Sequence, residues 1–208
     1  MTTHTRMEPS PAFTAKDGPL RWAETRALIR KDFERFFPPT DERPALSKRV
    51  FWLLLPSYQC MLLYRLYRHA YLRGWRKLAS FLFLVSLYLT RAEIPPSTSI
   101  GGGCLICHCP VILCGRIGEN FTLMGDGGIG GGFESDDIGG GPGLPVVGND
   151  VVMAIKSIVL GPVRIGDGAR LGPSCTVMRD VPAGAVVAGP LSRITCGTET
   201  THNVRATS

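Results

Sequence analysis

The sequence has few charged residues and no hydrophobic run long enough to cross a membrane. Only 19% of the 208 residues are Asp, Glu, Lys or Arg, which disfavours long amphipathic bundles and coiled coils. The longest apolar stretch, residues 78–90, is shorter than the roughly 20 residues that cross a bilayer. It follows the basic residues Arg73, Arg76 and Lys77. This stretch therefore predicts a buried or interfacial helix rather than a transmembrane one.

Signatures of several other protein classes are also missing. The 25 glycines show no strict three-residue period, which excludes collagen. The first twenty residues contain no apolar core followed by a small-residue cleavage site, so we expect a cytoplasmic protein whose seven cysteines are reduced. No aromatic-basic motif accompanies the net charge of +6, so we expect no nucleic-acid partner. The arginine-rich N-terminal half fits a solvated basic face or weak association with an acidic membrane surface.

Hydrophobic residues make up 44% of the chain, enough for a core, and their spacing predicts helices in the N-terminal half. We expect a disordered leader over residues 1–20 and a helical domain over residues 21–92. Its helices are expected at residues 22–37, 47–55, 57–73 and 75–90, because apolar residues recur there at spacings of three and four. Pro38, Pro56 and Gly74 mark the breaks between them.

Beyond Ile94 the apolar period changes to six, the signature of a hexapeptide-repeat β-helix. The repeat is regular through Val147, Met153, Val159, Ile165, Leu171 and Val177. Upstream it runs through Ile94, Ile100, Ile106 and Ile112, slips by one residue to Ile117, and resumes at Leu123 and Ile129. In such repeats the aliphatic residue points inward and stacks on its counterparts in neighbouring coils. We therefore predict a parallel β-helix over residues 93–195 and a flexible tail over residues 196–208.

A glycine-rich stretch interrupts the repeat over residues 125–143. Ten of its nineteen residues are glycine, and we expect a loop extruded from the β-helix, either a bare loop or a wall of an active site. It lacks the G-x-x-x-x-G-K-[ST] pattern and does not open a helix, which argues against a P-loop.

Together these segments resemble the serine acetyltransferase branch of the hexapeptide-repeat acyltransferases. The resemblance rests on the hexads, residues 57–65 (S-Y-Q-C-M-L-L-Y-R), residues 93–101 (E-I-P-P-S-T-S-I-G) and the closing run of residues 165–194. It implies an α+β chain with an N-terminal helical domain followed by a C-terminal left-handed parallel β-helix. It also implies an acetyl-CoA-dependent O-acetyltransferase that forms a homotrimer or a dimer of trimers, with acetyl-CoA bound between adjacent subunits and no metal.

The resemblance assigns the catalytic role to His108. In I-C-H-C-P-V-I it matches the family histidine that acts as general base on the acceptor hydroxyl. Backbone amides of residues 125–132 are candidate donors to the oxyanion that forms. The positions expected to contact acetyl-CoA are Gly130, Gly131, Ala154, Ile155, Arg179 and Arg193.

Two departures from the family pattern fall at positions expected to bind the acceptor. Cys107 stands where the family has an aspartate, and Leu144 where it has a second histidine. The helical-domain carboxylate that holds serine has only a loose counterpart at Asp41 or Glu42. We therefore expect an acceptor that is serine or a related small hydroxyl compound, with free serine used poorly. The alternatives are a sugar hydroxyl in polysaccharide biosynthesis and a catalytically impaired β-helix scaffold.

Further expectations come from the C-terminus, the cofactor-facing coil and the cysteines. The chain ends in V-R-A-T-S without the isoleucine that docks cysteine synthase in this family, so we expect no such complex. The glycine and alanine pattern of the family's CoA-facing coil is weakened in M-A-I-K-S-I, residues 153–158.

Cys104, Cys107 and His108 satisfy the haem-attachment pattern C-x-x-C-H, and with Cys109 and Cys114 they offer enough ligands for zinc. Haem and zinc sites are thus rival interpretations of this segment.

Overall fold

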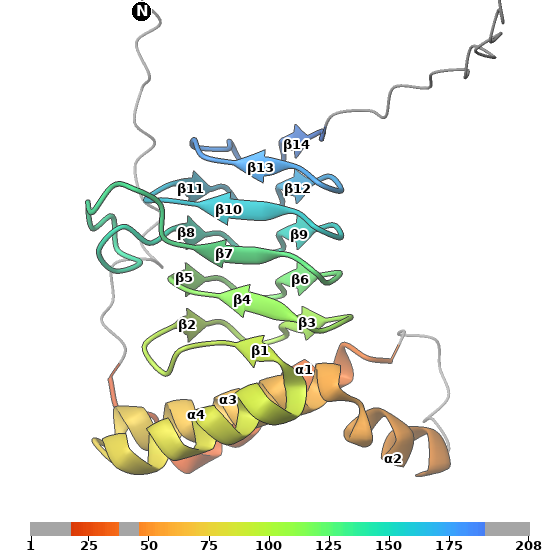
Figure 1. The fold of residues 1–208 in the computed structure, drawn as a ribbon. Helices are drawn as coiled ribbons and strands as arrows, with labels where there is room; N and C mark the ends of the chain where they lie inside the picture. Colours follow the sequence, from red (N-terminus) through yellow and green to blue (C-terminus); the bar gives the residue numbers. More distant parts are fainter. Residues whose placement is uncertain (1–17, 38–45, 190–208) are drawn as a thin grey trace, which may run out of the picture.

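The computed structural model describes residues 18–37 and 46–189, which form a layer of helices beneath a column of short strands (Figure 1). The helices are α1 (Trp22–Glu34), α2 (Leu46–Leu54), α3 (Pro56–Leu72) and α4 (Arg76–Thr90). They agree with the predicted helices to within three residues at each end. Pro56 opens α3, where its missing N–H costs no hydrogen bond, and Gly74, with φ of +84°, makes the turn between α3 and α4.

The column consists of three parallel sheets, each of which receives one strand from each full coil. The first, here the β1 sheet, contains β1 (Ala92–Glu93), β4 (Val111–Leu113), β7 (Gly128–Gly130), β10 (Ile158–Leu160) and β13 (Thr176–Val177). The β2 sheet contains β2 (Ser99–Ile100), β5 (Arg116–Ile117), β8 (Val146–Val147) and β11 (Arg164–Ile165). The β3 sheet contains β3 (Leu105–Ile106), β6 (Thr122–Leu123), β9 (Val152–Met153), β12 (Arg170–Leu171) and β14 (Val186–Val187). This arrangement confirms the predicted left-handed parallel β-helix.

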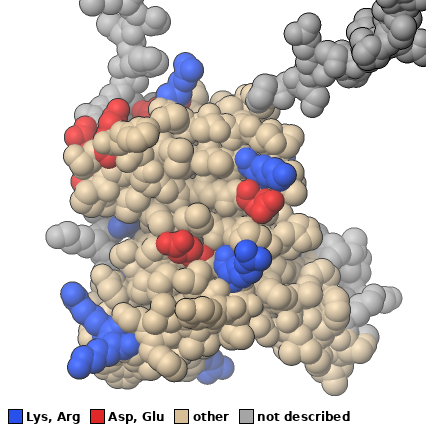
Figure 2. All heavy atoms as spheres, viewed as in Figure 1, with Lys and Arg blue, Asp and Glu red and all other residues tan. Residues whose placement is uncertain are grey.

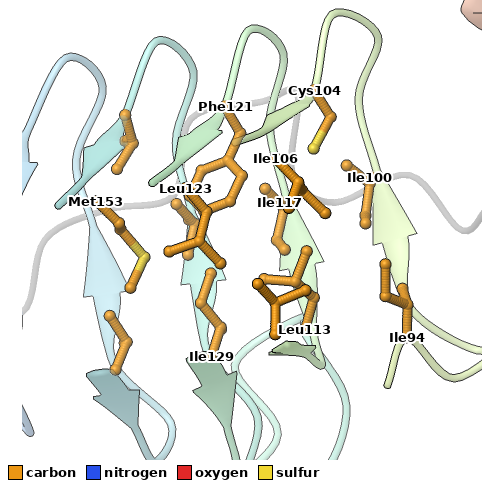
Figure 3. Close-up of a cluster of buried hydrophobic side chains, with 14 of the residues drawn as sticks. Ile94, Ile100, Cys104, Ile106, Leu113, Ile117, Phe121, Leu123, Ile129 and Met153 are labelled. Carbon is orange, nitrogen blue, oxygen red and sulfur yellow. The ribbon is translucent and has the colours of Figure 1, made fainter. Parts of the chain in front are cut away.

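Inward-pointing aliphatic side chains form stacks through the interior of the β-helix. Figure 3 shows Ile94, Leu113 and Ile129 in one row and Leu123 and Met153 in another, and all five are fully buried. Backbone pairing fixes the rows, since Leu113 pairs with Ile129 and Leu123 with Met153. Each such side chain contributes about 1.5–3 kcal/mol through burial. The hexad spacing is therefore the spacing of a continuous core.

One inward position was predicted wrongly. Ile112 was expected to point inward, but it is 48% exposed, and Leu113 takes the core position instead. The cause is the corner between β3 and β4, where the spacing from the buried Ile106 to the buried Leu113 is seven residues rather than the six of a regular hexad. The same corner carries His108, so the irregularity of the repeat coincides with the candidate catalytic residue.

The glycine-rich excursion is shorter than expected. Residues 128–130 form β7, with Ile129 in the core, so the chain leaves the β-helix only after Gly130. Within the excursion, the Asp137 carboxylate accepts hydrogen bonds from the N–H groups of Gly139 and Gly141. Arg116 and Arg164 donate to carbonyl oxygens of the excursion at 3.1 and 3.0 Å and tie it to the β2 sheet. The loop therefore has a defined structure of its own.

A buried ion pair joins the helices to the first coil. Arg65 of α3 donates to both carboxylate oxygens of Asp32 of α1, at 2.8 and 3.1 Å, and both side chains are almost fully buried. The same two side chains bind the coil backbone: Asp32 accepts from the N–H groups of Gly103 and Cys104, and Arg65 donates to the carbonyl oxygens of Ile100 and Gly101. These bonds satisfy both charges and fix α1 and α3 against the β-helix.

We predict that Asp32→Ala lowers the free energy of unfolding by about 3–5 kcal/mol, because it leaves the Arg65 guanidinium buried without a counter-charge. The matched control is Glu119→Ala, which removes the exposed Lys31–Glu119 ion pair and should cost no more than about 1 kcal/mol. Urea denaturation of each variant at one fixed protein concentration measures both values. An equally small loss of unfolding free energy in the two variants would show that the buried pair does not hold α1 and α3 against the first coil.

Candidate functional site

His108 lies on an edge of the β-helix, at the corner between β3 and β4, and its side chain is exposed. The next coil packs directly against this corner through Gly125. A Cβ atom on Gly125 would lie only 2.7 Å from the Cβ of His108 and 3.0 Å from its carbonyl oxygen. Gly125 also has a φ of +127°, which side chains rarely tolerate. The close approach that positions His108 thus requires glycine in the neighbouring coil.

A pocket of about 580 Å³ opens beside His108, between the helices and the corner. One wall comes from the end of α1 and the junction of α2 and α3, and the other from the β3–β4 corner. The residues that line it are Arg35, Phe36, Trp52, Leu55, Pro56, Ser57, Leu105, Cys107, His108 and Cys109. The rings of Phe36 and Trp52 lie 5.6 Å apart, and together they form an aromatic patch on the helical wall. The pocket is therefore largely apolar, with the imidazole at its edge.

The pocket contains a cation and no carboxylate among its described lining residues. Arg35, just after α1, is held by a 2.7 Å hydrogen bond that its guanidinium donates to Thr122 Oγ1. Burial raises the pKa of the Cys107 thiol, although the charge of Arg35 partly opposes this. Cys107 therefore stays a neutral thiol at pH 7 and does not supply the negative charge of the aspartate that it replaces.

Cys109, which follows His108 in the chain, forms a pair of thiols with Cys60. Cys60 of α3 is fully buried, and its thiol lies 3.1 Å from the carbonyl oxygen of Ser57. The thiols of Cys60 and Cys109 also lie within hydrogen-bonding reach of each other, and the hydrogen bond that Cys60 donates lowers the pKa of Cys109. Cys107 and Cys109, two residues apart, thus have pKa values shifted in opposite directions.

Of the expected cofactor contacts, two lie on the same edge as His108. Ala154 and Ile155 form the corner between β9 and β10, two coils beyond His108. Backbone hydrogen bonds link the successive corners: Lys156 N–H donates to the Gly125 carbonyl and Ser174 N–H to the Ile155 carbonyl, each at 3.0 Å. The edge is therefore a straight line of stacked corners, which suits an extended ligand that ends at the imidazole.

The remaining expected cofactor contacts do not lie on this edge. Gly130 and Gly131 lie at the far end of β7, and Arg179 lies beyond β13, so the width of the β1 sheet separates them from His108. That width is three residues, about 10 Å. Arg193 lies outside the described residues, as do Asp41 and Glu42.

Leu144 does not line the His108 pocket of its own chain. It lies at the end of the glycine-rich excursion, where its side chain is near Gly131 and Gly141. Within one subunit the structure therefore brings together only one of the two departures, Cys107, with the candidate base.

Among the backbone amides of residues 125–132, those of Gly125, Gly127, Gly131 and Gly132 have no backbone acceptor within the described residues. The N–H groups of Met124, Asp126 and Gly128 all donate to neighbouring coils. The N–H of Gly125, which packs on His108, has no acceptor within the part of the chain that the structure describes. It is the candidate donor to an oxyanion that lies nearest the imidazole.

The haem and zinc interpretations gain no geometric support. Cys104 points into the core and is fully buried, whereas His108 is exposed, so the two do not face one ligand. Across residues 18–37 and 46–189, no three His, Cys, Asp or Glu side chains gather closely enough to hold a metal ion.

Sequence reasoning did not identify the helical wall of the pocket. Phe36 and Trp52 belong to apolar helical patterns and count as core residues by spacing alone, and Arg35 reads as a solvated cation. Only the docking of the helices onto the first coil brings them beside His108. The sequence does indicate a buried partner for Asp32. It is four residues after Leu28 on the apolar face of its helix, and a carboxylate in that position needs a partner.

Comparison with curated proteins shows similarity to several serine acetyltransferases. The chain is 30% identical to that of Helicobacter pylori strain J99 over 152 residues, which cover 72% of this chain and 86% of the relative. It is 32% identical to that of Mycobacterium tuberculosis over 129 residues, which cover 55% of that longer protein. No protein-family model matches the sequence.

Solved structures show the same fold. The serine acetyltransferase of Vibrio cholerae matches with a TM-score of 0.69 at 20% identity, and the chain spans 64% of that protein's length. The serine acetyltransferase of Brucella abortus matches with a TM-score of 0.69 at 22% identity over 84% of this chain.

The opposite pKa shifts of Cys107 and Cys109 predict different pH profiles for alkylation. Because the thiolate is the reactive form, Cys109 should react with iodoacetamide at lower pH than Cys107. Cys60→Ala removes the hydrogen-bond donor and should move the Cys109 profile to higher pH, whereas the control Cys175→Ala should leave it unchanged. Mass spectrometry of alkylated peptides gives both profiles. A lower pH midpoint for Cys107 than for Cys109 would contradict these assignments.

Proposed function

The chain belongs to the serine acetyltransferase family of acyltransferases, and we propose that it moves the acetyl group of acetyl-CoA to a hydroxyl acceptor with His108 as general base. The observation that carries this proposal is the position of His108. Its imidazole is exposed at the mouth of an apolar pocket and at the end of a straight edge of stacked corners. An acceptor in the pocket and a donor along the edge would meet at this side chain.

The imidazole takes the proton of the acceptor hydroxyl as the acceptor oxygen attacks the thioester carbonyl. The thioester supplies an activated acetyl group, so no protein nucleophile is needed. The N–H of Gly125 stabilises the oxyanion of the tetrahedral intermediate. As the C–S bond breaks, protonated His108 returns the proton to the departing CoA thiolate, which restores the neutral base.

We place the extended arm of acetyl-CoA along the edge that carries Ala154 and Ile155. Ile155 is 47% exposed there and offers apolar contact to the arm. The second wall of this groove comes from an adjacent subunit of a trimer. The same packing would bring Leu144 of one subunit toward the pocket of the next, since it does not line the pocket of its own chain.

A sugar hydroxyl is the second candidate acceptor, and the lining of the pocket favours it over free serine. An ammonium group needs a carboxylate partner, yet no described lining residue is acidic and Cys107 is a neutral thiol. Phe36 and Trp52 instead provide an apolar platform on which the C–H face of a sugar ring can lie. The amphipathic character of a sugar matches this wall and the polar groups at its rim.

We predict that His108→Asn lowers acceptor-dependent acetyl transfer by at least about 10²-fold, because general-base catalysis contributes 10²- to 10⁴-fold, and that His108→Ala does the same. His69→Asn is the matched control. His69 lies on α3, where its Nδ1 is 2.8 Å from Thr25 Oγ1, far from the pocket lining. CoA release measures the rate, and light scattering checks that assembly is unchanged.

Equal rates in parent and His108 variants would remove His108 from the mechanism. A parent without turnover on any acceptor would indicate the scaffold alternative.

We predict that serine is a poor acceptor, with kcat/KM below about 10⁴ M⁻¹s⁻¹, the lower end of the usual enzyme range. Each unsatisfied polar group of bound serine costs about 1–3 kcal/mol, so two such groups lower turnover by about a hundredfold or more. A panel of serine, homoserine and sugars in a CoA-release assay tests this.

Two variants make the acceptor test specific. Cys107→Asp combined with Leu144→His restores the family residues and should raise serine turnover. Trp52→Ala should raise KM for a sugar acceptor while leaving KM for serine nearly unchanged. Efficient serine turnover by the parent chain would contradict the proposed selectivity.

We predict that the protein is a trimer or a multiple of three, because one subunit provides only one wall of the donor groove. Light scattering at micromolar concentration measures the mass. A well-folded monomer or dimer that still transfers acetyl groups would show that the groove is complete within one chain.

A further inference from the structure

Helix α4 exposes large apolar side chains to solvent along its whole length. They are Trp75 at its N-cap and Leu78, Phe81, Leu84, Tyr88 and Leu89 within it. Phe81 and Leu89 are each 62% exposed, and Tyr88 is 85% exposed. At 3.6 residues per turn, these six side chains spread over about half of the helix circumference. We call these six residues the α4 face.

The opposite side of α4 packs on α3 and the core, partly through Leu82 and Phe83, and the Phe83 ring lies 5.9 Å from the ring of Tyr67 of α3. Ala79, Ser86 and Thr90 are the buried residues of the helix. The helix is therefore apolar on its outer side as well as on the side that packs on the core. A helix that is apolar on its outer side as well is covered by something in the working protein.

The α4 helix does not cross a membrane. Its 15 residues span about 22 Å at 1.5 Å per residue, less than the roughly 30 Å of a bilayer core. No helix in the described part of the chain has the length and hydrophobicity to do so. An apolar helix of this length can instead lie in the plane of a membrane surface.

The charge around the α4 face points to an anionic partner. The sequence contains no Asp or Glu between Arg43 and Ala92. Arg73, Arg76 and Lys77 are exposed at the N-terminal end of α4. Figure 2 shows blue side chains gathered at one end of the helical layer and no red ones over that layer in this view. Two acidic residues, Glu93 and Asp126, line a cleft at the other end of α4, together with Arg91.

We propose that the α4 face docks on a membrane surface that contains anionic lipid. Phe81, Tyr88 and their neighbours enter the interfacial layer, and the basic end pairs with lipid phosphates. A second copy of the chain is the poorer partner, because its α4 face comes from the same acid-free segment and offers no negative charge to the basic end. The pocket of His108 is lined by other elements and stays open when α4 is docked.

Flotation of the full-length protein with lipid vesicles tests this proposal. The protein should bind vesicles of phosphatidylcholine mixed with phosphatidylglycerol, and much less to phosphatidylcholine alone. Replacing Arg73, Arg76 and Lys77 together by Gln should lower the partition coefficient by about a hundredfold, since each surface cation contributes about fivefold. Phe81→Ser with Tyr88→Ser should also abolish binding, and because both side chains are exposed, folding should not change.

The matched control is Arg26→Gln with Arg170→Gln, which removes exposed charge from α1 and the β-helix and should leave binding unchanged. CoA release in the absence of vesicles should be the same in all these variants, because none of these residues lines the His108 pocket. No binding to anionic vesicles, or equal binding to both kinds, would overturn the proposal. So would a change in oligomeric mass in the Phe81 and Tyr88 variant, since that would assign the α4 face to a second copy of the chain.

Discussion

The buried pair of Asp32 and Arg65 is the interaction on which the candidate site depends. It is the point where α1, α3 and the first coil of the β-helix meet, and four backbone groups of that coil bind to it. Arg35 follows Asp32 by three residues, and His108 follows the bound Cys104 by four. The ion pair thus fixes the distance between the two walls of the pocket. Without this ion pair each wall of the pocket would keep its own structure, but the aromatic patch of Phe36 and Trp52 would move away from the imidazole.

The coil geometry supplies the second constraint. A regular hexad corner keeps its residues close to the column, whereas the seven-residue spacing from Ile106 to Leu113 lets His108 stand at the exposed edge. Gly125 then packs against this corner at a distance no side chain could occupy. The site therefore combines a corner that is one residue longer than a regular hexad with a glycine, Gly125, that leaves room for it. Because Cys107 is a neutral thiol, the described lining of the pocket contains no carboxylate, which separates this pocket from the family pattern.

The sequence predicts the β-helix well because an aliphatic residue every six positions identifies the inward residue of each coil. Equivalent residues of successive coils then stack, so the fold follows from the repeat alone. The prediction fails at Ile112, since Ile112 and Leu113 are both aliphatic and corner length leaves no mark in the hydrophobic pattern. It places Ile129 in the repeat but also assigns residues 128–130 to the glycine-rich loop, because glycines at 128 and 130 are typical of loops; the structure shows the strand β7 there. The helical wall of the pocket depends on contacts between residues some 55 to 75 positions apart, such as Trp52 and Phe36 with His108, and local patterns do not contain those contacts.

In the proposed mechanism the acetyl group passes directly from CoA to the acceptor with the imidazole of His108 as base, although thiols of Cys107 and Cys109 line the same pocket. Intact-mass spectrometry of the protein incubated with acetyl-CoA in the absence of acceptor distinguishes direct transfer from a route through a thioester on the protein. Direct transfer predicts an unchanged protein mass, and acetyl groups that appear only on an added acceptor. An acetylated protein that loses its acetyl group to the acceptor at the rate of turnover would contradict it.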